Sequence, residues 1–340
     1  MQSAYGRRST IDTGAGQFSI SAEGTLVYLP GTVVPDDRRF LYWVDRAGHA
    51  ERLPVPAGPL VQPRIAPDGE HLAFHTAQAQ QDIWIYDLVR RNVTRLTKEG
   101  RNATPVWSPD GRRIVYRSSI TGPDNLFWLP VDAKVPPQRL TTTSEHEVPA
   151  AWSSDGDVLA FYRLTDTEFE LWTLSVDGDG TGNKIMGATN AQGGADFSPD
   201  GKWVAYATTE TGRWEVYVEG FPSGTGRQQV STDGGMSPVW RHDGRELFFV
   251  SAGSDPDESS SLRMMATAVS IGPVPRFGAP RLLFEGPYES SYPARGYDVA
   301  PDGRHFVLAQ REQTPAVPLK RFVLVQNWFE ELKSKVPITK

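Results

Sequence analysis

A short turn motif ending in Asp-Gly recurs along the whole chain, each time between two apolar runs. The copy Ser108-Pro109-Asp110-Gly111 is typical. Proline presets φ for the first central position of a turn, aspartate can accept a hydrogen bond from its own backbone two residues on, and glycine tolerates the positive φ that follows. Each copy therefore predicts the tight turn of a β-hairpin.

The spacing of this turn predicts the architecture. We count seven copies, including a weaker one, Ser21-Ala22-Glu23-Gly24, and their glycines lie 42 to 45 residues apart until a last interval of 59. The turn glycines are Gly24, Gly69, Gly111, Gly156, Gly201, Gly244 and Gly303. Four-stranded propeller blades repeat at this period. We therefore expect an all-β chain, a seven-bladed β-propeller of four-stranded antiparallel blades, as a single domain over residues 1–340.

Both ends of the chain enter this prediction. The seventh repeat lacks a fourth strand, and residues 8–11 occupy the place where every other repeat keeps one. Pairing this N-terminal strand with residues 321–325 would close the ring and leave no exposed edge. Residues 327–333 predict a short helix within a C-terminal tail of residues 326–340.

Composition excludes some classes of protein. The formal net charge is −6 and no Lys/Arg block is interleaved with aromatic residues, so we expect no nucleic-acid partner. There is no cysteine, which excludes disulfides and thiolate chemistry. No stretch of about 18 apolar residues occurs, so we expect no membrane-spanning segment in this chain.

The repeat resembles a known family. Its fullest copy is Trp107-Ser108-Pro109-Asp110-Gly111-Arg112-Arg113-Ile114. This run and its relatives resemble the PD40, or TolB-like, class of WD40-like β-propeller repeats over essentially the whole chain. The Trp-Asp dipeptide that closes each true WD40 repeat is missing.

A looser resemblance concerns bacterial serine/threonine kinases. It is carried by Glu215-Val216-Tyr217-Val218-Glu219-Gly220-Phe221-Pro222, by Arg281-Leu282-Leu283-Phe284-Glu285-Gly286-Pro287-Tyr288 and by Asn327-Trp328-Phe329-Glu330-Glu331-Leu332. These runs are similar to the C-terminal sensor propeller of such kinases. The resemblance implies an extracytoplasmic, periplasmic location, with a cytoplasmic one left open. Kinase motifs are absent from this sequence.

Candidate ligand-binding residues come from the loops that lead into each innermost strand. Propellers bind at the mouth of the central channel, where loops from all repeats converge. These loops carry a mixed polar and aromatic set that suits a protein, a peptide or a small polar ligand. The predicted site residues are Arg101, Asn102, His146, Glu147, Asn190, Gln192, Met236, Tyr292 and Arg295.

Two functions of different classes are compatible with this pattern. The first is a non-catalytic sensor or binding module with no cofactor and no catalytic residue, which the resemblance to kinase sensor propellers would make the extracytoplasmic part of a kinase. The second is a propeller enzyme, a lyase or hydrolase, whose acid/base pair would be Glu147 and His146. Glu145-His146-Glu147 is the one tight cluster of metal-ligand types, but neighbours on an extended segment point in different directions, so we expect no metal site.

Overall fold

The computed structural model describes residues 18–21, 23–28, 38–78, 80–166, 168–178, 180–185, 191–252, 261–270, 272–289, 294–312 and 323–335. The chain forms two compact units. Residues 38–311 make up the larger unit, and the smaller unit combines residues 1–37 with residues 312–340.

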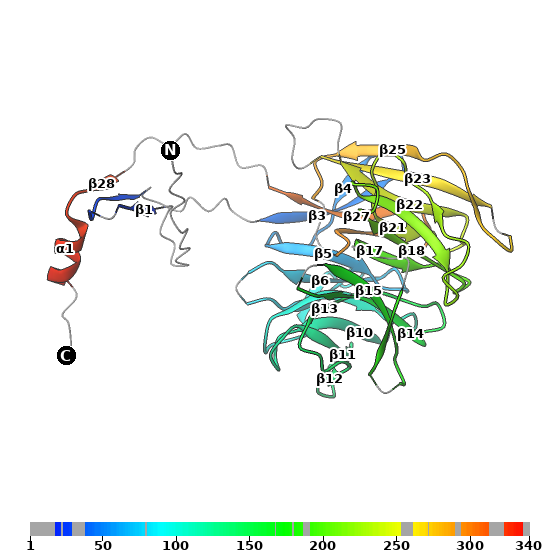
Figure 1. The fold of residues 1–340 in the computed structure, drawn as a ribbon, viewed down its shortest axis with the longest axis horizontal. Helices are drawn as coiled ribbons and strands as arrows, with labels where there is room; N and C mark the ends of the chain where they lie inside the picture. The colour runs from blue at the N-terminus through cyan, green and yellow to red at the C-terminus, as the bar shows by residue number, and fades with distance from the viewer. Residues whose placement is uncertain are drawn as a thin grey trace. The chain divides into compact units, whose positions relative to one another are not determined.

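The larger unit is a six-bladed β-propeller whose blades are antiparallel sheets (Figure 1). Blade one has β5 (Leu60–Ile65), β6 (His71–Thr76), β7 (Ile83–Asp87) and β8 (Asn92–Arg95). Blade two has β9 (Asn102–Trp107), β10 (Arg113–Ser118), β11 (Asn125–Pro130) and β12 (Gln138–Arg139). Blade three has β13 (His146–Trp152), β14 (Val158–Leu164), β15 (Phe169–Ser175) and β16 (Gly182–Lys184).

The remaining three blades follow the same pattern. Blade four has β17 (Ala191–Phe197), β18 (Trp203–Thr208), β19 (Glu215–Gly220) and β20 (Gln228–Gln229). Blade five has β21 (Met236–Trp240), β22 (Glu246–Ala252), β23 (Leu262–Ser270) and β24 (Arg276–Phe277), with β25 (Arg281–Gly286) also paired to β23. Blade six has β26 (Tyr297–Val299), β27 (His305–Arg311), β3 (Arg39–Asp45) and β4 (Ala50–Arg52).

Blade six is shared between the two ends of the propeller sequence. The register of β27 with β3 runs from His305 opposite Asp45 to Arg311 opposite Arg39. The blue strand β3 and the orange strand β27 lie side by side in Figure 1. The ring is thus closed by two inner strands from the end of the propeller and two outer strands from its beginning, which leaves no open sheet edge between the first and last blades.

The prediction of seven blades closed by the N-terminal strand is wrong. Only the six Asp-Gly turns belong to propeller blades, and the Glu-Gly copy at Gly24 joins β1 (Phe18–Ile20) to β2 (Leu26–Tyr28) in a separate three-stranded sheet with β28 (Val323–Val325). Residues 8–11, the expected closing strand, lie outside the described residues. The physical reason is that a turn motif specifies a hairpin but not the sheet that the hairpin joins.

The smaller unit has its own packing. Leu26 pairs with Val325 in the sheet, and the helix α1 (Trp328–Lys335) follows β28 directly. The Trp328 amide donates a hydrogen bond to the Gly24 carbonyl at 2.7 Å. Gly24 has φ +84°, and a Cβ atom there would lie 2.8 Å from the Phe329 ring. Glycine is therefore required both by the backbone conformation and by the close approach of the helix.

The propeller core lies between adjacent blades. Phe248 of blade five and Phe306 of blade six are fully buried, and their ring centroids lie 5.2 Å apart in an edge-to-face arrangement. Tyr162 of blade three and Tyr206 of blade four are likewise buried in one shared cluster. Because both faces of each blade pack against neighbours, the ends of the central channel and the outer rim are the surfaces open to ligands.

Candidate functional site

The six Asp-Gly turns share one conformation. Gly111 has φ +67°, and the turn glycines of the other blades have φ between +64° and +80°. In the turn of blade two, Ser108 Oγ donates to Asp110 Oδ1 at 2.6 Å, and the Arg112 amide donates to the same oxygen at 3.0 Å. The repeated sequence therefore places the second residue of each turn at an equivalent position around the channel.

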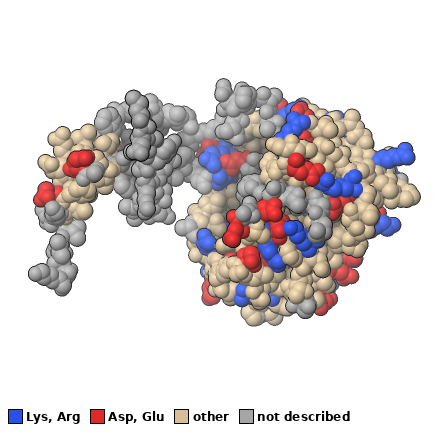
Figure 2. Space-filling view, in the orientation of Figure 1, with Lys and Arg blue, Asp and Glu red and all other residues tan. Residues whose placement is uncertain are grey.

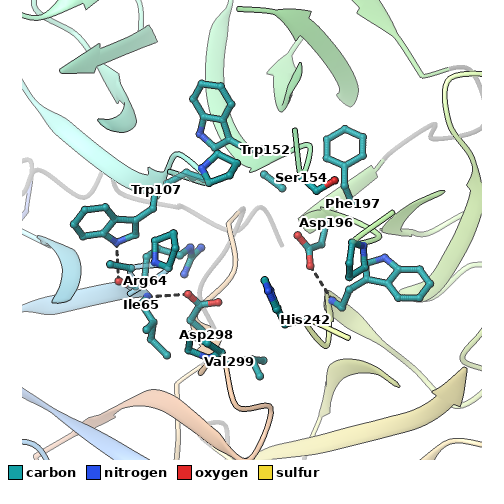
Figure 3. A pocket seen from close by; sticks show the side chains of 18 of the residues that line it. Arg64, Ile65, Trp107, Trp152, Ser154, Asp196, Phe197, His242, Asp298 and Val299 are labelled. Atoms are coloured by element: carbon teal, nitrogen blue, oxygen red, sulfur yellow. Dashed lines mark hydrogen bonds between the residues drawn. The ribbon is translucent and has the colours of Figure 1, made fainter. Parts of the chain in front are cut away.

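These second residues surround a cavity of about 550 Å³ at the end of the channel where the turns lie. Every blade contributes one: Pro67, Pro109, Ser154, Pro199, His242 and Pro301. We call this space the turn-end cavity (Figure 3). Its volume falls in the range of small-molecule sites.

The wall below this rim is largely apolar. It is formed by the last residue of each innermost strand, namely Ile65, Trp107, Trp152, Phe197, Trp240 and Val299. The Trp107 indole Nε1 donates to the Arg64 carbonyl at 3.1 Å, which ties blade two to blade one. A rigid wall of this kind is preorganised, because its side chains also belong to the packing between blades.

Two aspartates at equivalent strand positions bridge adjacent blades (Figure 3). Asp298 Oδ2 accepts a hydrogen bond from the Ile65 amide at 2.8 Å, and Asp196 Oδ2 accepts one from the Trp240 amide at 2.8 Å. Each aspartate lies one residue before the end of its innermost strand. The bridges satisfy backbone donors that the strand ends would otherwise leave facing the channel.

The charges around the turn-end cavity are unequally paired. Arg295 Nη2 donates to Asp298 Oδ1 at 2.7 Å, so this cation and anion neutralise each other. Burial lowers the pKa of Arg295, but Asp298 and Asp196 raise it by more, and its pKa lies above the usual value. The other two charged residues of the cavity, Arg64 and Asp196, have no such partner.

Arg64 is held by carbonyl oxygens alone. It is 4% exposed, and it donates to the carbonyls of Pro63 at 2.8 Å, Arg295 at 2.7 Å and Tyr297 at 3.3 Å. Within the described part of the chain no carboxylate forms an ion pair with it, and its Nε is buried with no hydrogen-bond partner. Burial, together with repulsion from Arg295, lowers the pKa of Arg64 to about 9.

Asp196 faces the cavity from the blade opposite Arg64, with two blades between them on either side (Figure 3). Burial raises the pKa of the Asp196 carboxyl to about 6, against the opposing influence of Arg295 and the Trp240 amide. No Lys, Arg or His among the described residues lies within ion-pair distance of this carboxylate.

The structure places the predicted site residues in different environments. Arg295 lines the turn-end cavity. Arg101 is exposed, Asn102 is buried with its side chain on the Glu99 carbonyl, and His146 and Met236 begin innermost strands. Asn190 and Tyr292 lie outside the described residues, and Gln192 is described only as a β17 residue opposite Ala207.

Glu147 is a buried structural carboxylate. It is fully buried, and its Oε1 accepts a hydrogen bond from Arg163 Nη2 at 2.9 Å. Thr141 Oγ1 donates to its other oxygen. His146, next to it in β13, instead has Nδ1 3.5 Å from Asp124 Oδ2 and is half exposed. The two residues therefore face different surroundings, as expected for neighbours on a strand.

Sequence reasoning missed Arg64, Asp196 and His242. The first two are charged residues inside otherwise apolar or small-residue strands, which is itself a signal of a channel-facing position. His242 replaces the proline found at the second position of most turns. The described residues contain no cluster of three or more His, Asp or Glu side chains that could hold a metal ion.

The fold defines this chain as a six-bladed β-propeller with an open channel end. A family described as "TolB beta propeller domain" (PD40) matches residues 41–194. A structure of TolB from Agrobacterium tumefaciens superposes with a TM-score of 0.65 at 18% identity, covering 82% of this chain and 99% of that one. These matches support a TolB-like β-propeller.

Two curated relatives match part of the chain. An uncharacterized protein from Agrobacterium fabrum is 28% identical over 152 residues, which are 44% of this chain and 50% of the relative. An uncharacterized peptidase from Bacillus subtilis is 26% identical over 195 residues, 45% of this chain and 30% of the relative. The chain thus spans half or less of these relatives. In the described part of the chain, no helix is long and apolar enough to cross a membrane.

Proposed function

We propose that this protein is a binding module, in which the propeller is a rigid scaffold and the turn-end cavity receives a ligand or a segment of a partner. One observation carries the proposal: all six blades contribute a turn residue to one cavity of about 550 Å³. A site built from six repeats brings turn residues as far apart in the sequence as Pro67 and Pro301 around a single ligand. Its specificity can therefore change without altering the scaffold.

The finer features of this function are also proposals. We propose that the module is a sensor located outside the cytoplasm, because its sequence resembles the sensor propellers of bacterial kinases. The TolB-like match supports a binding role and is compatible with this location. The face drawn in Figure 2 intersperses acidic and basic side chains, which favours a protein, peptide or small polar ligand over nucleic acid.

The enzyme hypothesis has one specific observation in its favour, the similarity to an uncharacterized peptidase from Bacillus subtilis. The matched segment is 30% of that relative. The chain itself does not favour an acid/base pair at His146 and Glu147, because the Glu147 carboxylate is buried against Arg163. A catalytic function would therefore depend on other residues or on another part of a longer protein.

Site-specific crosslinking tests where binding occurs. A photoreactive amino acid is placed at Pro109 in the turn-end cavity, at Arg101 in the loops at the opposite end of the innermost strands, or at Gln138 on the outermost strand. All three positions belong to blade two or the loop before it, so the scaffold is the same. We expect the photoreactive group at Pro109 to crosslink to a bound partner, and an excess of the chain without that group to compete for the partner. We expect no crosslink from Gln138.

The other outcomes have defined meanings. Crosslinks from Arg101 alone would support the loop end of the channel, with residues such as His146 and Met236, as the binding site. Crosslinks from Gln138 alone would overturn binding at the channel. If the purified chain alone turned over a substrate, this activity would favour the enzyme hypothesis.

A further inference from the structure

The turn-end cavity contains one cation and one anion that form no direct ion pair within the described part of the chain. Arg295 and Asp298 neutralise each other at 2.7 Å. Arg64 and Asp196 form no direct ion pair with any residue that the structure describes, although Asp298 and Asp196 favour the charged form of Arg64 and Arg295 favours that of Asp196 from a greater distance. A buried charge without a direct partner is costly, and such a group in a cavity is a candidate for binding a ligand of opposite charge.

Arg64 and Asp196 lie across the channel from each other. Arg64 belongs to blade one and Asp196 to blade four, which are opposite in a ring of six blades (Figure 3). Both line the same cavity. A ligand that satisfies both must therefore carry two opposite charges separated by a spacer that spans the channel.

The chemistry of each group selects its partner. A guanidinium has five donors arranged to match a carboxylate, and Arg64 Nη2 uses one of its two N–H groups for the Arg295 carbonyl at 2.7 Å, which leaves the other for a ligand. A carboxylate in turn accepts hydrogen bonds from a protonated amine, and Asp196 uses one oxygen for the Trp240 amide at 2.8 Å. The apolar wall, which includes Trp107, Trp152 and the proline rim, suits a spacer of methylene or alanyl groups.

We propose that the turn-end cavity binds a dipolar ligand, with its carboxylate on Arg64 and its protonated amine on Asp196. ω-Amino acids and short peptides with both termini free share this chemistry, whereas an α-amino acid such as alanine carries both charges without a spacer. The inference rests on the proposed function, because it names the class of ligand for the cavity that the function requires.

Calorimetric titration of the folded chain tests the proposal with three probes: alanine, 6-aminohexanoate and tri-alanine. The longer probes are expected to bind more tightly than alanine, because they can span the channel. Tri-alanine amide, which lacks the carboxylate, and N-acetyl-tri-alanine, which lacks the amine, are each expected to bind at least tenfold more weakly than tri-alanine. The probe with the highest affinity identifies which source of the chemistry the cavity takes.

Two variants assign each charge to its residue. The Arg64→Gln variant should bind tri-alanine amide as well as it binds tri-alanine, but it should still bind N-acetyl-tri-alanine more weakly. In Asp196→Asn the pattern should be reversed. Arg112→Gln, an exposed turn residue of blade two, is the matched control and should leave all affinities unchanged. Thermal melts establish that each variant folds, and the blocked peptides test the proposal on the unaltered chain should Arg64→Gln not fold.

The results separate the inference from the function it rests on. If no probe binds, or if blocked and free peptides bind equally, the dipolar ligand is overturned, while crosslinks from Pro109 would still support the binding module. If the probes bind but blocking either terminus of tri-alanine weakens binding to both variants as much as to the unaltered chain, the assignment to Arg64 and Asp196 is overturned. If crosslinks form from Gln138 alone, the binding module itself fails.

Discussion

Arg46 donates two hydrogen bonds to Glu246, with Nη1 2.9 Å from Oε2 and Nη2 2.7 Å from Oε1. Arg46 follows β3 in blade six, and Glu246 begins β22 in blade five. The same carboxylate also accepts from Arg241 at 3.2 Å and Arg281 at 3.1 Å. An ion-pair network thus joins the blade that begins and ends the ring to the blade before it.

Glu246→Gln should lower the free energy of unfolding by about 1 to 3 kcal/mol, since Arg46 and Arg281 lose their anionic partner and Arg241 keeps only Asp243. Burial raises the pKa of Glu246, but hydrogen bonds to Arg46 and Arg281 outweigh burial and lower its pKa. The native carboxyl therefore binds protons less readily than the unfolded one, and its contribution is lost as the pH falls through the folded pKa. Urea unfolding at pH 7 and pH 4 measures this, with exposed Glu70→Gln as the control. An equal loss at both pH values would contradict it.

Gly111→Val should lower the free energy of unfolding by about 1 to 3 kcal/mol, because a β-branched residue is strained at φ +67°. A Cβ atom there would meet only Pro67 Cδ, at an ordinary 3.7 Å, so the loss would come from the backbone. Gly111→Asn, which tolerates this conformation, should lose less than half as much. Arg101→Ala should be nearly neutral. Thermal melts compare the three variants, and equal losses in all three would mean that turn strain is not the cause.

Glu147→Gln should destabilise the fold by about 3 to 5 kcal/mol, because Arg163 would be left partly buried without this anion. Glu145→Gln, two residues earlier and partly exposed, is the matched control. Chemical denaturation measures both. An unchanged stability for Glu147→Gln would show that this carboxylate is not structural and would restore it as a candidate general base.

Asp196→Asn should alter the pH dependence of stability in the unliganded chain. Burial raises the pKa of Asp196 from 3.8 to about 6, so the folded state binds a proton that the unfolded state releases. Stability from this group is complete below pH 4 and is lost as the pH rises to about 6, by about 1 to 3 kcal/mol. Asparagine keeps an acceptor for the Trp240 amide but does not titrate. Melts from pH 4 to pH 7 should show a smaller decline for the variant, and parallel curves would argue against a raised pKa.

The sequence contains much of the local structure of this fold. Turn residues such as Asp110 and Gly111 specify hairpins through hydrogen bonds and φ, which act over a few residues. The number of blades depends on long-range pairing instead. Whether β3 joins β2 or β27 is decided by tertiary packing, and a repeat count that included Gly24 could not reveal it.

The site could be predicted less well than the fold. Loop residues such as Arg101 and His146 are polar, but solvated loops are polar whether or not they bind a ligand, so polarity is a weak criterion. Arg64 and Asp196 could have been noted as charges within buried strands, but their opposition across the channel depends on a ring of six rather than seven blades. In a ring of seven, no two blades lie directly opposite each other.

The shared blade also constrains how this chain can be made. In the finished blade, β27 pairs with the edge of β3 that β4 does not cover. The β3–β4 hairpin leaves the ribosome more than 200 residues before β27 has been synthesised. During translation β3 is therefore an unpaired edge strand able to pair with another nascent chain. A protein truncated before Tyr297 would keep that edge permanently, so premature termination should yield aggregates rather than a smaller propeller.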